Sequence, residues 1–126
     1  MKRLPSIIAL LLLVVPMFAA ADVAGKWSGS FQTTRPDGKV SDEKIVMNFT
    51  QKDVDVTGTA GPTADMQQAI RNGKVTGDKL AFEMTTPDGA VTSFALTLAN
   101  GHLKGEASAE LRGTKFKGVV DATREK

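Results

Sequence analysis

From residue 22 onward, apolar or small side chains recur at every second position, and polar side chains fill the positions between them. Residues 27–31 show this pattern near the start, and residues 94–98 show it further along. No window has the spacing of three and four residues that an amphipathic helix requires. Alternation with a period of two is typical of antiparallel strands that have one face in a core and the other in water. We therefore predict an all-β chain of eight strands with no substantial helix.

The connections between these strands differ in length at the two ends of the predicted sheet. Tight turns follow the even-numbered strands, and Asn100-Gly101 is the clearest of them because both residues tolerate positive φ. Longer connections follow the odd-numbered strands, and two of them contain Pro-Asp-Gly, a β-turn signature. They cover residues 35–42, 61–67, 86–90 and 111–114. Because successive strands run in opposite directions, we expect all the long connections at one end and all the tight turns at the other.

Four strands have a glycine in the centre of an apolar-x-Gly-x-apolar pattern, on the face that is predicted to point inward. They are Gly29, Gly58, Gly105 and Gly118. Glycine fills no space in a core, but it lets a strand coil sharply and lets a neighbouring backbone approach closely. Strands with inward glycine and alanine also alternate with strands that carry phenylalanine, methionine and leucine, as in narrow barrels. The pattern favours an eight-stranded antiparallel up-and-down β-barrel over a sandwich.

The first 21 residues have the pattern of a secretory signal peptide. Lys2 and Arg3 precede an apolar run, and Ala19 and Ala21 supply the small residues before a cleavage site. The run is too short for a stable membrane span, which needs roughly 20 apolar residues. We predict cleavage after Ala21, a single β-barrel domain at 22–126, and a secreted or periplasmic location.

Removal of that peptide changes the net charge. The chain has 16 basic and 14 acidic side chains, and the numbers become equal once Lys2 and Arg3 are removed. A domain without net charge has no general attraction to nucleic acid or to anionic membranes. The chain has no cysteine, so no disulfide staples its core. We predict a monomer with no nucleic-acid partner.

The first and last strands of the predicted barrel resemble those of the calycins, the family of lipocalin-like and avidin-like barrels. The residues that carry this resemblance are Gly25-Lys26-Trp27, which open the first strand, and Arg124, which lies on the inward register of the last. The resemblance implies that Gly25, Trp27 and Arg124 close one end, with the arginine over the indole ring, and that the protein carries a small molecule. The chain is shorter than a typical lipocalin and lacks the helix that follows their barrel. It has one Trp and no Tyr, so biotin binding has no support. Small secreted bacterial barrels without an assigned function are also similar to it.

The sequence offers little material for catalysis. His102 is the single histidine, and it follows a tight turn on the outward register. Of the two carboxylate pairs, Asp42 and Glu43 are expected in a loop, and Asp53 and Asp55 beside a turn. We expect no carboxylate at an inward position, although a glycosidase would need two across a cleft. We therefore predict no enzyme, no catalytic residue, no metal site and no cofactor, and a hydrolase is the weakest alternative.

Two kinds of binding are compatible with the sequence. In the first, a small apolar ligand enters the barrel from the long-loop end, against a wall of Phe31, Met47, Phe49, Phe82, Met84, Phe94, Leu96 and Phe116. In the second, side chains fill the core, as is common in barrels of eight strands, and the loops bind a protein or a polysaccharide. The loop rim is then formed by Arg35, Asp37, Lys39, Asp65, Arg112 and Lys115. The number of large inward side chains favours a filled core, whereas the calycin resemblance favours the apolar ligand.

Overall fold

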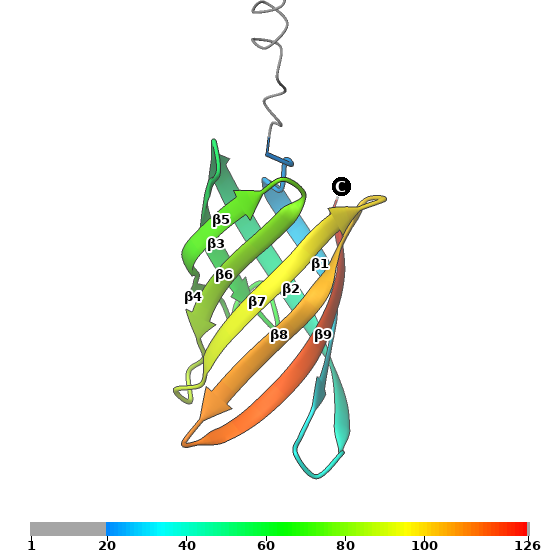
Figure 1. Cartoon of the computed structure of the whole chain (residues 1–126), viewed down its shortest axis with the longest axis vertical. Coiled ribbons are helices and arrows are strands. Elements are labelled where there is room, and N and C mark those ends of the chain that lie inside the picture. The colour runs from blue at the N-terminus through cyan, green and yellow to red at the C-terminus, as the bar shows by residue number, and fades with distance from the viewer. Residues whose placement is uncertain (1–19, 126) are drawn as a thin grey trace, which may run out of the picture.

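The computed structural model describes residues 20–125, and most of the predicted signal peptide therefore lies outside the described residues. Within this range all regular structure is β-strand. The strands are β1 (Gly25–Thr34), β2 (Val40–Lys52), β3 (Asp55–Gly61), β4 (Gln68–Ala69), β5 (Arg71–Thr76), β6 (Lys79–Thr85), β7 (Val91–Ala99), β8 (His102–Leu111) and β9 (Thr114–Arg124). Figure 1 shows that the long connections lie at one end of the molecule, opposite the tight turns and the C-terminus.

Eight of these strands form a closed antiparallel barrel, which confirms the predicted fold class (Figure 1). Each strand of the ring pairs with its neighbours along the chain, and β1 pairs with β9 to close the ring. The remaining strand is β4, which pairs only with β3. It comes just before β5 in the chain, and β5 also pairs with β3. On β3, Thr59 pairs with Ala69 and Val56 pairs with Gly73. The two β3 residues are three positions apart in the chain, whereas their two partners are four positions apart. One extra residue therefore forms a bulge. The pairing of β5 with β6 places it between Arg71 and Lys74, where the register shifts and Asn72 has a φ of 55°.

Inward glycines allow the strands to coil tightly around the barrel axis. A Cβ atom on Gly29 would collide with the carbonyl oxygen of Asp121 on β9. A Cβ atom on Gly58 would collide with the carbonyl oxygen of Asn48 on β2, and Gly58 also has a φ of +145°. Both collisions are with backbone atoms, which cannot move without opening the ladder between the strands. Glycine is therefore required where neighbouring backbones approach most closely.

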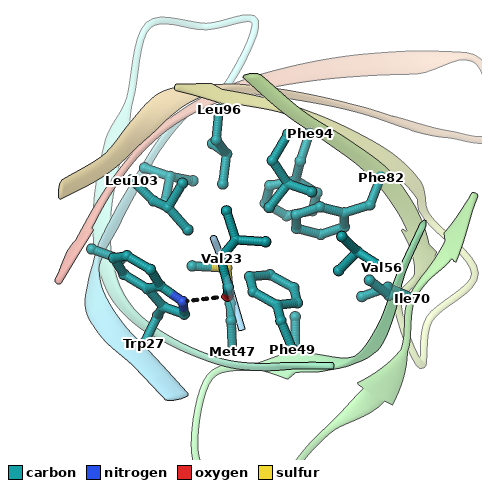
Figure 2. Packing of buried hydrophobic residues seen from close by; sticks show 14 of the residues in the cluster. Val23, Trp27, Met47, Phe49, Val56, Ile70, Phe82, Phe94, Leu96 and Leu103 are labelled. Atoms are coloured by element: carbon teal, nitrogen blue, oxygen red, sulfur yellow. Dashed lines mark hydrogen bonds between the residues drawn. The ribbon is translucent and has the colours of Figure 1, made fainter. Parts of the chain in front are cut away.

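The interior next to the tight-turn end is filled with side chains (Figure 2). Phe49, Phe82 and Phe94 form a continuous aromatic contact across this core, with centroid distances of 5.5 Å between the first two rings and 4.5 Å between the last two. Phe31 extends the row at 5.9 Å from Phe94. Such close contacts give the interior the density of a packed core. Buried side chains therefore pack together across this half of the barrel.

The residues just before β1 close the tight-turn end. Val23 is buried inside the barrel and its carbonyl oxygen accepts a hydrogen bond of 2.9 Å from Trp27 Nε1 (Figure 2). The Val23 amide donates to Gln51 Oε1 at 2.8 Å. Arg124 lies with its guanidinium carbon 4.6 Å from the centroid of the Trp27 ring and donates to the Asp22 carbonyl oxygen at 2.6 Å. The N-terminal lead thus forms a plug that is fixed to β1, β2 and β9.

Candidate functional site: a cavity at the long-loop end

The barrel contains a cavity of about 520 Å³ at the long-loop end. Its volume lies within the range of about 300–1,000 Å³ that is typical of small-molecule sites. Most of the lining belongs to inward positions of β1, β2 and β6–β9, and the rest to the end of β3 and to connections at the mouth. The apolar lining side chains include Phe31, Ile45, Pro62, Met84, Phe94, Leu111 and Phe116.

The predicted ligand wall divides between the cavity and the core beneath it. Four of its residues line the cavity: Phe31, Met84, Phe94 and Phe116. The other four are buried in the packed core: Met47, Phe49, Phe82 and Leu96. Side chains therefore fill one half of the interior, and the other half contains the cavity. The row of phenylalanine rings separates the two halves.

The predicted rim residues lie in or beside three of the connections at this end. Among them, Arg35 lines the cavity. The other five are exposed and are not part of the lining: Asp37, Lys39, Asp65, Arg112 and Lys115. Gly25, Trp27 and Arg124 lie together at the opposite end, where a Cβ atom on Gly25 would lie 3.5 Å from Nε of Arg124.

Two charged residues of the cavity lining, Glu43 and Asp88, were not predicted. Glu43 pairs with Phe31 in the ladder of β1 and β2, so both side chains are on the inward face, and Glu43 lines the cavity. The expectation of a loop through Asp42 is wrong, because β2 begins at Val40. The expectation that inward positions have no carboxylate is therefore also wrong. The alternation that predicted Ile45 as inward, continued by two residues toward the N-terminus, would have identified Glu43.

The two Pro-Asp-Gly turns belong to two hairpins with the same register. Residues 31–43 ("FQTTRPDGKVSDE") and 82–94 ("FEMTTPDGAVTSF") align without a gap. Phe31 pairs with Glu43 in the first hairpin, and Phe82 pairs with Phe94 in the second. Both turns have the same two backbone hydrogen bonds, each 2.9 Å long. In the first turn the Arg35 amide donates to the Lys39 carbonyl and the Gly38 amide to the Arg35 carbonyl, and Thr86, Ala90 and Gly89 form the equivalent pair in the second. In the ring order, each hairpin is separated from the other by two strands on either side, so the hairpins face each other across the barrel.

The matching hairpins give the cavity two different walls. The inward side chains of the β6–β7 hairpin near the mouth are Met84, Thr92 and Phe94. The equivalent positions of the β1–β2 hairpin are Thr33, Ser41 and Glu43. The side chains of the β1–β2 hairpin are smaller or polar. They leave space at positions where the larger side chains of the β6–β7 hairpin fill the interior. The cavity therefore has a polar wall on β1–β2 and a mainly apolar wall on β6–β7.

A second carboxylate lies at the rim, in the β6–β7 turn. The hydroxyl of Thr86 donates a hydrogen bond to Asp88, and this bond is the main cause that lowers the pKa of the Asp88 carboxyl from its ordinary value. The nearby Arg112 guanidinium lowers this pKa further. A hydrogen-bond donor and a nearby positive charge both favour the ionised form of a carboxylate. Asp88 therefore already has partners within the protein, unlike a free ligand-binding group.

The remaining ionisable groups do not form a second site. Among residues 20–125, no three His, Cys, Asp or Glu side chains are close enough together to hold a metal ion. His102 Nδ1 lies 2.7 Å from Asp121 Oδ1, and Lys104 Nζ is 3.9 Å from the other oxygen of that carboxylate. These side chains are about half exposed on the outer face of β8 and β9, away from the cavity.

Comparisons with protein-family models, with curated proteins and with solved structures found no match to this chain. In the part of the chain that the structure describes, there is also no helix with the length and apolar character that a membrane crossing requires.

Proposed function

We propose that the protein is a secreted or periplasmic binding protein that holds a small, mainly apolar molecule in the cavity at the long-loop end of its barrel. The observation that carries this proposal is the cavity of about 520 Å³ above a floor of packed phenylalanine rings. Concave sites lined by aromatic side chains with a few polar groups are the usual form of small-molecule sites. The resemblance to calycin barrels supports the same function by analogy of fold.

The proposal is tested by binding of 1-naphthalenemethanol, a neutral aromatic probe, measured by isothermal titration calorimetry and by thermal melting. A ligand at about ten times its Kd stabilises the folded state by about 1.4 kcal/mol, which raises the Tm of a domain of this size by about 6–11 °C. Trp27 is at the opposite end of β1 from the cavity, so its fluorescence is not a suitable reporter of binding.

A matched pair of variants locates the binding site. Ala109 lines the cavity, and the adjacent Ser108 is exposed on the outer face of the same strand. Ala109→Phe fills the cavity and should abolish probe binding, whereas Ser108→Phe should bind like the natural chain. Equal binding by both variants, or no stabilisation of the natural chain by the probe, would contradict the proposed site. Native mass spectrometry of protein purified from its own host then identifies any co-purified ligand.

A further inference from the structure

The charge on the polar wall points to a particular class of ligand. Glu43 pairs with Phe31, so its backbone lies level with the aromatic floor of the cavity. Arg35 is four residues after Phe31 and lies in the turn just beyond β1. Four residues span about 13 Å in an extended strand. Asp88 lies in the opposite turn. Among the charged residues that line the cavity, Glu43 is therefore the one whose backbone lies deepest.

The carboxylate of Glu43 is available to a ligand. Within residues 20–125, Glu43 takes part in no ion pair. The equivalent position in the second hairpin is Phe94, which is buried in contact with Phe31 and Phe82. The barrel thus accommodates a phenylalanine at this position of the β6–β7 hairpin. The equivalent position of the β1–β2 hairpin, beside the cavity, has a carboxylate instead.

We propose that the natural ligand is an amphipathic organic cation, whose apolar part lies against Met84, Phe94 and Phe116 and whose protonated amine is bound by Glu43. This inference rests on the proposed function, because it assigns a ligand class to the same cavity. A protonated amine can donate to the carboxylate, and hydroxyl oxygens of Thr33 and Ser41 line the same wall. Arg35 lies nearer the solvent, where its charge is screened more strongly.

The test compares three probes with the same naphthyl ring: 1-naphthylmethylamine, 1-naphthalenemethanol and 1-naphthoate. Glu43 is an exposed residue. Calorimetry near neutral pH should therefore give a Kd for the amine that is about three to five times lower than that of the alcohol, the effect expected of an exposed ion pair. The carboxylate probe should bind more weakly than the alcohol. The preference for the amine should decrease at high salt.

Two variants assign the preference to Glu43. Glu43→Gln removes the charge with little change in shape and should make the affinities for amine and alcohol equal. Asp42→Asn removes the same charge from the adjacent residue, which faces outward and accepts a hydrogen bond from Gln32. This control should retain the preference of the natural chain.

The outcomes separate this inference from the proposed function. If the alcohol binds in the cavity but the amine has no advantage, or if naphthoate binds best, the ligand class is wrong and the proposed function stands. An amine preference that survives in Glu43→Gln would also overturn the assignment. If none of the three probes binds, the proposed function fails and the inference fails with it.

Discussion

Replacement of Arg124 by alanine tests how the tight-turn end is closed. Arg124 makes two contacts that alanine cannot make: its guanidinium lies 4.6 Å from the centroid of the Trp27 ring, and its Nη2 atom donates to the Asp22 carbonyl oxygen at 2.6 Å. The first contact joins β9 to β1, and the second joins β9 to the N-terminal plug. The variant therefore weakens the closure of the barrel and the attachment of the plug together.

The expected magnitude follows from these two contacts. A cation over an aromatic ring at an exposed site contributes about 0.5–1 kcal/mol, and Arg124 belongs to the exposed class. A typical hydrogen bond adds about 0.5–1.5 kcal/mol. The sum is about 1–2.5 kcal/mol, and each kcal/mol lowers the Tm of a domain of roughly 100 residues by about 4–8 °C. We expect Arg124→Ala to lower the Tm by at least about 4 °C.

The assay is thermal unfolding followed by tryptophan emission, because Trp27 is the single tryptophan and is completely buried. Lys117→Ala is the matched control: it removes a positive charge from an exposed residue of the same strand, remote from the indole ring. The control should melt like the natural chain. If Arg124→Ala unfolds at the same temperature as Lys117→Ala, the contacts of Arg124 do not stabilise the closure and the reasoning is wrong.

Two further predictions concern the strand ladder and the rim. Gly29→Ala should destabilise the barrel by about 1–3 kcal/mol or more, because the new Cβ collides with the Asp121 carbonyl oxygen; in denaturant melts the control Ser30→Ala should change stability little, and an equal effect would refute the need for glycine. The pKa of Asp88, measured by NMR titration, should lie below its ordinary value and should rise in Thr86→Val, which loses the hydroxyl donor. Because the folded pKa is lowered, ionised Asp88 contributes stability above its unfolded pKa and loses it as the pH falls through the folded value; an unchanged pKa in the variant would contradict this cause.

The sequence predicted the barrel well because local patterns specify it. Alternation with a period of two defines which residues of a strand share a face, and turn residues such as Asn100-Gly101 define where a strand reverses. Inward glycines then favour closure of the sheet, and Gly29 and Gly58 do lie where neighbouring backbones meet. These are properties of single strands or adjacent strands, so they can be read along the chain.

The candidate site was predicted less completely because charged residues at a strand end resemble a loop. Ser41, Asp42 and Glu43 have no apolar member among them, so the predicted β2 began too late and the inward position of Glu43 was missed. Two signals in the sequence could have corrected this: the parity of Ile45 and the match between residues 31–43 and 82–94. The bulge within residues 71–74 had no comparable signal, because an extra residue shows only in the pairing with the neighbouring strands β3 and β6.

By itself, the sequence determined an antiparallel barrel with its long connections at one end, since alternation, turns and glycines act over a few residues. The tertiary structure decided which half of the interior is filled. Packing depends on which side chains meet across the axis, and these come from strands far apart in the chain. Phe31 and Phe94 meet in the interior and form the floor of the cavity. Glu43, which pairs with Phe31, lines the cavity above this floor. Only closure of the ring brings these residues together, and the same closure creates the base that Val23 seals.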